Sequence, residues 1–394
     1  MRVRRCATLM LEPRERLEFS LTVLSGGGSG LHRVIEWIAL APHRDEELAL
    51  SPDEVVVIGA VSPSTWVEFD ELAKAHARDV LDALLDKQLL IAEASDVASR
   101  DQMLRDTHWR NASAVMHYAS RWRGVDTEDV RDDFAENAGG QLVDWLGPAP
   151  PMVRERADST QRLALPKNDA VTALDALLDR RVTCRNYDRS RKLSQQQFSA
   201  VLHRVFGARA VDDYAPGVQL MKKGVPSAGG LHATEAYLIV QHVEGIAPGL
   251  YHYHPVDHAL EPITSLDADA AATLAKRCVA AQSYFVDAHV IVIPTSRFRR
   301  NFWKYRNHAK AYRALILDVG HLSQTLYLAA TELGLAAFVT AAINEVDIER
   351  AFGLDPLEEG PLAVCGFGIR APERNEAEFD PLNAVWAAET LTSA

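Results

Sequence analysis

The spacing of apolar and polar residues predicts a mixture of helices and strands from residue 169 to the end of the chain. Helical spacing and short apolar runs alternate there, and one run, His289–Pro294, is typical of a buried strand. The predicted helices cover 170–180, 194–206, 267–282 and 307–333, and the later strands cover 336–341 and 361–369. This order predicts an α+β fold in which helices surround a central sheet.

The longest predicted helix, 307–333, is apolar around most of its circumference. One stripe follows the i, i+3, i+4, i+7 rule, and a second set of alanines lies outside it. The stripe consists of Tyr312, Leu315, Ile316, Val319, Leu322, Leu326 and Ala330. Such a helix must be buried on more than one side, so we expect part of it to lie in a subunit interface.

The first hundred residues have a different pattern. The run Gly26–Gly30 indicates a flexible connector, and 55–92 reads as helix, turn, helix and a hairpin strand. That order is typical of a winged helix, so residues 1–100 are predicted to form a winged-helix-like domain. Asp and Glu outnumber Lys and Arg over 55–92, which disfavours DNA binding.

A connector is predicted between these two parts. Residues 101–145 have helical spacing with polar interruptions, and the proline-rich stretch Gly147–Pro151 opens a charged tract that is typical of a linker. We therefore expect three regions, namely the domain 1–100, a connector over 101–165, and a second domain over 166–394.

Composition narrows the class of protein. The 394 residues are 47% hydrophobic and 24% charged, and the net charge of −12 argues against a nucleic-acid-binding surface. No run of about 18 apolar residues predicts a membrane span. Four well-separated cysteines give no metal or redox-dithiol spacing, so we expect no metal site and a cytoplasmic protein.

Two short motifs carry candidate chemistry. The loop Pro226–Gly230 brings small residues to the start of an apolar strand, which suits close approach to a flat ligand but is also an ordinary turn composition. Arg181, Thr183 and Arg185 alternate along an extended segment, so their side chains face the same way. Such a fork suits a phosphate, although a solvated basic loop has the same composition.

These motifs, together with GLYHYHPVDHAL, WKYRNHAKAYRALILDVGHLSQTLYLAATELGL and PLAVCGFGIR, occur in an order that resembles the nitroreductase-like FMN proteins. More narrowly, the chain resembles the streptolysin-type azoline dehydrogenases, which mature ribosomally made peptides. The resemblance covers about residues 165–372. It implies a nitroreductase-like FMN fold and a homodimer with the flavin held between the two subunits.

The resemblance also implies roles for individual residues. Arg181, Thr183 and Arg185 would meet the FMN phosphate and ring edge, and Arg370 would close on the phosphate. The isoalloxazine and ribityl chain would lie against Pro226, Ser227, Ala228 and Gly230. Backbone groups of Ala341 and Ala342 would face the pyrimidine edge of the ring. Two positions depart from the family pattern, because Asp318 stands where glutamate is frequent and Thr325 where asparagine is frequent.

Lys304 and Tyr305 match the Lys-Tyr pair of the azoline dehydrogenases, which simple nitroreductases lack. Aromatising an azoline removes a proton from carbon while a hydride goes to the flavin, so a base is required. A free lysine is a poor base near neutrality. Burial and the nearby arginines 299, 300 and 306 would disfavour its charged form. The alternative is a basic surface patch that only contacts a peptide or a partner.

The sequence thus favours an FMN-dependent dehydrogenase that acts on a precursor peptide, whose leader the N-terminal domain would bind through an edge strand. A cyclodehydratase or another maturation enzyme is an expected partner. Two alternatives stay open. One is a flavin reductase of a dehydroamino acid, nitro or quinone compound, and the other is a non-catalytic flavin-fold scaffold of a maturation complex.

Overall fold

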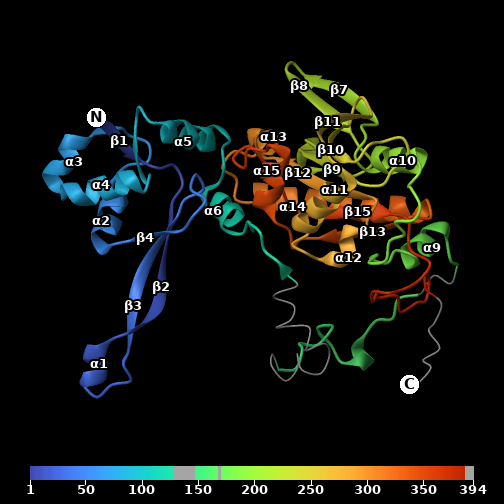
Figure 1. The fold of residues 1–394 in the computed structure, drawn as a ribbon, viewed down its shortest axis with the longest axis horizontal. Helices are drawn as coiled ribbons and strands as arrows, with labels where there is room; N and C mark the ends of the chain where they lie inside the picture. The colour runs from blue at the N-terminus through green and yellow to red at the C-terminus, as the bar shows by residue number, and fades with distance from the viewer. Residues whose placement is uncertain (128–146, 167–169, 387–394) are drawn as a thin grey trace. The chain divides into compact units, whose positions relative to one another are not determined.

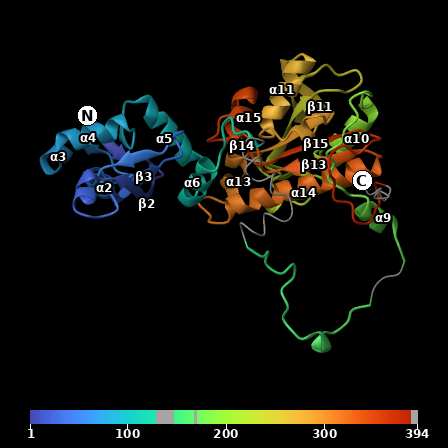
Figure 2. The ribbon, with the colours of Figure 1, turned by 60° about the horizontal axis from the view of Figure 1, so that its bottom comes forward.

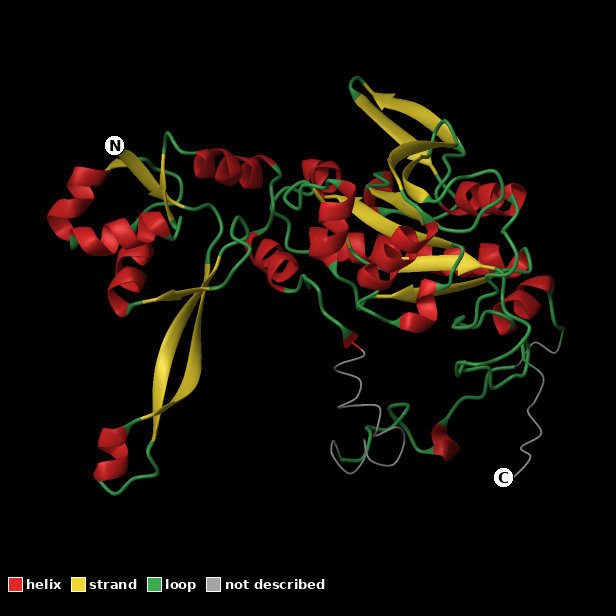
Figure 3. Cartoon of the chain, viewed as in Figure 1, coloured by secondary structure: helices red, strands yellow, loops and turns green. Residues whose placement is uncertain are grey.

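The computed structural model describes residues 1–127, 147–166 and 170–386. By internal contacts, the chain divides into two compact units. Unit 1 comprises Met1–Arg121, Ser296–Leu317 and Gly353–Gly360, and unit 2 comprises Trp122–Thr295, Asp318–Phe352 and Pro361–Ala394. The fold is α+β, as predicted, with helices and strands mixed along the chain (Figure 3).

The N-terminal part of unit 1 contains a small antiparallel sheet with strand order β5-β1-β6. Its strands are β1 (Arg2–Arg5), β5 (Val67–Glu68) and β6 (Leu90–Ala92), and its helices are α2 (Pro52–Ala60), α3 (Phe69–Ala75) and α4 (Arg78–Asp86). Helix α2 begins at Ser51, whose hydroxyl accepts from the Glu54 amide in a capping box. Val3, Ile58, Leu81 and Leu84 share one hydrophobic core. The helix–helix–strand order follows the sequence pattern, and the winged-helix comparison stays a prediction.

A long hairpin, which the sequence pattern did not predict, occupies residues 10–40 (Figure 1). Strands β2 (Met10–Phe19) and β3 (Leu31–Leu40) pair antiparallel from Met10 opposite Leu40 to Phe19 opposite Leu31. The loop between the strands begins with the short helix α1 (Leu21–Ser25), and the expected connector Gly26–Gly30 follows it. Strand β4 (Leu48–Leu50) pairs with β3, so β2 is an edge strand of this sheet.

An aromatic cluster lies in the rest of unit 1. It joins α6 (Asn111–Ala119), α13 (Phe298–Lys304) and the first turn of α14 (Ala311–Glu332). Trp109 and His117 both contact the Phe298 ring, and His117 Nδ1 lies 2.9 Å from the Tyr312 hydroxyl. Helix α5 (Asp96–Asp106) precedes this cluster. Helices α5 and α6 account for part of the predicted helical stretch 101–145, whose residues 128–146 lie outside the described ones.

Unit 2 contains the main sheet, with strand order β11-β10-β9-β12-β15-β13. These strands are β9 (Thr234–Val240), β10 (Gly249–His254), β11 (Ala259–Ser265), β12 (Val290–Arg297), β13 (Ala336–Thr340) and β15 (Val364–Gly368). Strand β14 (Glu359–Pro361) pairs with β12 beside this path, and β7 (Ala210–Ala215) pairs with β8 (Val218–Lys222) in a separate hairpin. The predicted strands near 289–294, 336–341 and 361–369 are therefore confirmed.

Helices cover both faces of the main sheet (Figure 2). Leu322, Leu326 and Ala330 of α14 pack with Val290 and Val292 in the largest core. The other helices are α9 (Ala173–Asp179), α10 (Gln195–Val205), α11 (Ala268–Cys278), α12 (Ser283–Val286) and α15 (Glu345–Phe352), with short 3₁₀ turns η1 (Ser159–Gln161) and η2 (Ala228–Gly230). The predicted helices 170–180, 194–206 and 267–282 correspond to α9, α10 and α11.

Helix α14 begins four residues later than predicted, because α13 and a turn precede it. Six residues of its predicted apolar stripe are buried, but Ile316 is 45% exposed and its neighbour Leu317 is 59% exposed. Two adjacent exposed apolar side chains on the surface of this helix are the kind of surface that a partner covers.

Two glycines of β15 allow the Phe338 ring and His289 to approach this strand closely. A Cβ at Gly366 would lie 2.2 Å from the Phe338 ring, and one at Gly368 would lie 2.3 Å from His289. The Phe338 ring in turn stacks on Phe285, with 3.9 Å between centroids. Only glycine fits at residue 366 while Phe338 keeps this position. Among the described residues, no helix is both long and apolar enough to span a membrane.

Candidate functional site

The loop Pro226–Gly230 precedes β9, and a buried carboxylate of α14 fixes it. Asp318 accepts a hydrogen bond from the Ser227 hydroxyl at 2.6 Å and from the Ala228 amide at 3.0 Å. The Ser227 hydroxyl also accepts from the His232 amide at 3.0 Å. Burial raises the pKa of Asp318, and the bonds from Ser227 and Ala228 oppose that shift. Asp318, which departs from the family pattern, therefore holds the loop.

The tip of this loop is open. Gly229 and Gly230 have φ of 61° and 71°, the left-handed region that favours glycine. A Cβ at Gly230 would meet no atom within 4 Å, so the space beside the backbone is free on this side. The backbone can therefore approach a flat ligand, as the composition suggested.

The segment Arg181–Arg185 runs beside β13 in an extended conformation. The Cys184 amide donates to the Ala337 carbonyl at 2.9 Å. Val182 and Cys184 are buried, whereas the side chains between them point the other way, as the alternation predicted. The Thr183 hydroxyl lies 2.9 Å from the Tyr327 hydroxyl of α14. The Arg181 guanidinium lies 5.3 Å from the centroid of the same tyrosine ring.

Arg185 and Arg370 are engaged by an internal carboxylate that the sequence did not reveal. Glu378 is buried and accepts from the Arg185 amide at 2.7 Å, from Asn186 Nδ2 at 2.8 Å and from Trp386 Nε1 at 2.8 Å. It also forms an ion pair with the Arg370 guanidinium. Burial raises the pKa of Glu378, but the hydrogen bonds outweigh it and the net pKa is lowered.

This arrangement bears on the expected phosphate site. The Arg370 guanidinium lies against Glu378, and Arg185 Nη1 donates to the Ala377 carbonyl at 3.0 Å while its guanidinium lies 4.8 Å from the Tyr284 ring centroid. Of the guanidinium groups of Arg181, Arg185 and Arg370, that of Arg181 is therefore the one whose described contacts include no carboxylate or carbonyl. Phosphate contacts by Arg185 and Arg370 stay predictions.

Ala341 and Ala342 follow β13 directly. Ala341 is exposed, and the Ala342 amide donates to the Thr340 hydroxyl at 3.2 Å. That hydroxyl in turn donates to Gln282 Oε1 at 2.7 Å. The Ala342 amide is thus already used within the loop, and the Ala341 backbone is the more accessible of the two.

All ten candidate cofactor residues lie in unit 2, and α14 connects two groups of them. Asp318 binds the loop at Ser227 and Ala228, and Tyr327 binds Thr183. Nine residues of helix separate the two contacts, which corresponds to about 13.5 Å along the axis. These residues fit a flavin in part: the space beside Gly230 suits a ring, and Thr183 with Arg181 offers a hydroxyl and a cation.

Lys304 and Tyr305 belong to unit 1 and end α13. The Lys304 side chain is exposed, and its Nζ lies 5.7 Å from the centroid of the Tyr305 ring. The sequence argument invoked burial of this lysine, and that expectation is wrong for the single chain. Any desolvation of Lys304 must come from a bound substrate or a second subunit.

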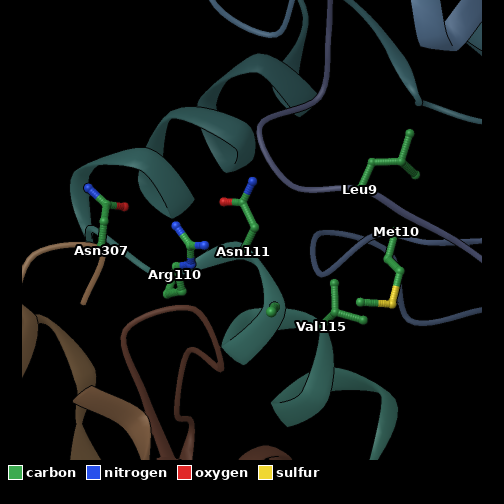
Figure 4. Close-up of a pocket in the computed structure, with 7 residues that line it drawn as sticks. Leu9, Met10, Arg110, Asn111, Val115 and Asn307 are labelled. Carbon is green, nitrogen blue, oxygen red and sulfur yellow. The ribbon is translucent and has the colours of Figure 1, made fainter. Parts of the chain in front are cut away.

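Unit 1 also contains a cavity of about 400 Å³ that the sequence did not indicate (Figure 4). It opens beside the start of the edge strand β2 and the first turn of α6. Its lining residues are Leu9, Met10, Arg110, Asn111, Ala112, Val115 and Asn307. Asn307 follows Tyr305 by two residues, so the cavity lies next to the segment that contains the Lys-Tyr pair.

Comparison with known proteins gives the family of the second half of the chain. Residues 178–369 match the model of the nitroreductase family, so this part of the chain is a nitroreductase-family domain with the corresponding fold. This confirms the resemblance to the nitroreductase-like proteins, whereas the narrower resemblance to azoline dehydrogenases stays a prediction.

Two relatives show how far the similarity extends. The chain is 33% identical over 155 residues to the trifolitoxin-processing protein TfxB of Rhizobium leguminosarum bv. trifolii, covering 39% of this chain and 41% of TfxB. It is 25% identical over 188 residues to the microcin B17-processing protein McbC of Escherichia coli, covering 46% of this chain and 65% of McbC. The matched part thus spans less than two thirds of either relative.

Among solved structures, the chain is similar to one from the E. coli microcin synthetase McbBCD complex with truncated pro-MccB17 bound. The TM-score is 0.48 at 19% identity, covering 70% of this chain and 98% of that one. A similarity at this level adds nothing about activity.

Proposed function

We propose that this protein is an FMN-dependent dehydrogenase of peptide maturation, which oxidises an azoline of a ribosomally made peptide to an azole. The nitroreductase-family match over residues 178–369 is the observation that carries this proposal. The names of TfxB and McbC, each a processing protein for a peptide product, support the substrate class. The Lys304-Tyr305 pair supports the azoline reaction in particular.

FMN would be held by unit 2. Arg181 and Thr183 would bind the phosphate. Arg370 would be available only if its guanidinium leaves Glu378, and Arg185 only if its guanidinium leaves the Ala377 carbonyl. The loop Pro226–Gly230 would support the ring, and its bond to Asp318 fixes the loop before any ligand arrives. When bound, the flavin supplies a hydride acceptor.

The protein's own acid–base step would fall to the exposed end of α13. Lys304 Nζ would take the proton from the azoline carbon, and Tyr305 would orient the amine or pass the proton on. Because Lys304 is exposed in the single chain, the peptide or a second subunit would have to exclude water from it. A homodimer is part of the proposal, and the exposed Ile316 and Leu317 on α14 support it.

The N-terminal part would bind the leader of the precursor peptide. Strand β2 is a ten-residue edge strand, and an extended peptide can pair with the free hydrogen-bonding groups of such an edge. The chain would work in the cytoplasm beside the cyclodehydratase that forms the azoline.

The first experiment is purification followed by peptide turnover. We expect a yellow protein with FMN near one per chain, and a loss of two hydrogens from a co-expressed azoline peptide by mass spectrometry. Lys304→Ala should keep the flavin and abolish the mass change, whereas Lys310→Ala, an exposed lysine on the same segment, should keep both. Full turnover by Lys304→Ala would remove the base assignment.

A scaffold function is the second candidate, and the contacts of Glu378 favour it. A chain whose Arg370 guanidinium is bound to its own carboxylate, and whose Arg185 guanidinium is bound to its own Ala377 carbonyl, has fewer groups for a phosphate. In that case the purified protein would be colourless, could not be reconstituted with FMN, and would still bind the other maturation proteins.

A further inference from the structure

Lys223 is a buried lysine directly behind the candidate flavin loop. It follows β8, it is 1% exposed, and three residues separate it from Ser227. Lysine is among the residues least often buried completely, because its ammonium group loses hydration. The chain thus keeps a cationic group inside the protein, at a position where an apolar residue would cost less.

A cavity of about 10 Å³ lies beside this lysine, close to the smallest that can hold one water molecule. Its walls combine apolar and polar side chains and include both residues that fix the loop, Ser227 and Asp318. The lining consists of Lys223, Val225, Pro226, Ser227, His232, Thr234, Asp318 and Leu322. The cavity therefore places an amine, a hydroxyl, an imidazole and a carboxylate around a single small space.

Lys223 is expected to change its protonation state at a pH close to neutral. Burial lowers its pKa to about 8, and the Glu235 carboxylate opposes that shift. Burial, together with the charges of Lys223 and Lys222, lowers the pKa of His232 to about 4. His232 is therefore neutral at pH 7, and Asp318 is the other ionisable group on the cavity wall. Of these groups, Lys223 is the one expected to change charge near pH 8.

A row of ionisable side chains leads from Glu235 to the surface. Across the sheet, His252 of β10 lies directly opposite Glu261 of β11 and opposite Tyr237 of β9, two residues beyond Glu235 on the same face. His252 Nδ1 is 2.6 Å from Glu261, and its Nε2 is 3.1 Å from Glu235. Glu261 is 58% exposed.

We propose that Lys223 is a positioning residue that holds a proton behind the candidate flavin loop, and that the Glu235 carboxylate, which His252 contacts, favours the charged form of this lysine. The inference rests on the proposed function, since it assigns a role toward the same loop. Only a proton moves, between Lys223 Nζ and bulk water. The charged ammonium would favour an anionic ligand at the loop, and its neutralisation above pH 8 would weaken that preference.

The first test measures the titration of Lys223 directly by NMR, in the full-length protein labelled with ¹³C-lysine. We expect one NMR signal that titrates near pH 8, disappears in Lys223→Met, and persists in Lys222→Met, the adjacent exposed lysine. Glu235→Gln should move the titration down by about one pH unit or more, because the opposing charge is lost. If every lysine titrated near its ordinary value, the inference would be overturned.

The second test concerns function and separates this inference from the proposed one. FMN affinity, measured by quenching of flavin fluorescence, should fall as pH rises through 8 in the wild type and in Lys222→Met, and should be flat there in Lys223→Met. If Lys223→Met does not fold, Glu235→Gln gives the same test through a shifted transition.

An unchanged pH dependence in Lys223→Met or Glu235→Gln would overturn the inference. A protein that never binds FMN would instead contradict the proposed function, and the NMR titration would still report on Lys223.

Discussion

Two segments of the candidate site are held in opposite ways. The loop Pro226–Gly230 is tied by the buried Asp318, which receives bonds from a side chain and a backbone amide. The segment Lys304-Tyr305 ends a helix whose other end is fixed by aromatic packing around Phe298, and its lysine is exposed. The loop is therefore ordered before any ligand binds. In the single chain, the Lys304-Tyr305 segment lacks the burial of the lysine that its proposed chemistry needs.

The largest effect is expected from closing the open side of the loop. Gly230→Trp should abolish flavin loading, because the indole would occupy the free space beside the backbone. Gly217→Trp is the matched control, since Gly217 also has a positive φ and open space but lies in the β7–β8 turn. Loading is measured by absorbance after reconstitution. Equal loading in the two variants would show that the loop does not contact the ring.

A smaller effect should follow from releasing the loop. Asp318→Ala removes the acceptor of the Ser227 and Ala228 bonds, so we expect FMN affinity to fall about 10- to 100-fold, equivalent to about 1–3 kcal/mol. Thr325→Ala, which loses only a bond to the His321 carbonyl of its own helix, should have little effect. Fluorescence titration distinguishes the two, and unchanged affinity in Asp318→Ala would mean that the loop is ordered without it.

The aromatic packing that fixes the start of α13 can be tested by lowering the pH, because it includes the buried His117. Burial, and secondarily the charge of Arg121, lowers the pKa of His117 to about 3 from an ordinary 6.5. The unfolded chain takes up a proton below pH 6.5 that the folded chain refuses, so stability should fall as pH drops from 6.5 toward 3. His117→Gln should be less stable at pH 7 but lose less stability on acidification.

Urea unfolding at pH 7 and pH 4.5 measures this difference, and His32→Gln, on an exposed position of β3, is the control. A wild-type protein equally stable at the two pH values would contradict the role of His117.

The smallest effect concerns Glu378. Its net pKa is lowered, so its contribution is present above its ordinary value of 4.5 and is lost as pH falls below it. Glu378→Gln should cost about 1–3 kcal/mol of unfolding free energy at neutral pH, since the charged acceptor for Arg370 and Trp386 is lost. If the same variant binds FMN more tightly than the wild type, then Glu378 competes with the phosphate for the Arg370 guanidinium.

Local patterns predicted the regular part of unit 2 but not the hairpin of unit 1. Helix α10 and strand β12 have strong periodicity or an unbroken apolar run, and both appear within a few residues of the expected bounds. Strand β2 has no buried residue on either face and contains Pro13, so it lacks the alternation by which a strand is recognised. Its pairing with β3 depends on the turn between them.

The contacts within the site were harder to predict, because they join distant parts of the sequence. The alternation in Arg181–Arg185 indicated correctly which side chains share a face. Nothing in the sequence showed that Asp318 would meet Ser227, 91 residues away, or that Glu378 would meet Asn186, 192 residues away. The expected burial of Lys304 was wrong for the single chain, because surrounding arginines in sequence do not imply cover in space.

The close approach of the Phe338 ring to Gly366 limits how this domain can evolve. Any side chain at residue 366 would collide with that ring, and a smaller residue at 338 would leave Phe285 without its stacking partner. Substitutions at positions 338 and 366 are therefore tolerated only together. Among homologues, a non-glycine residue at the second position should accompany a small one at the first.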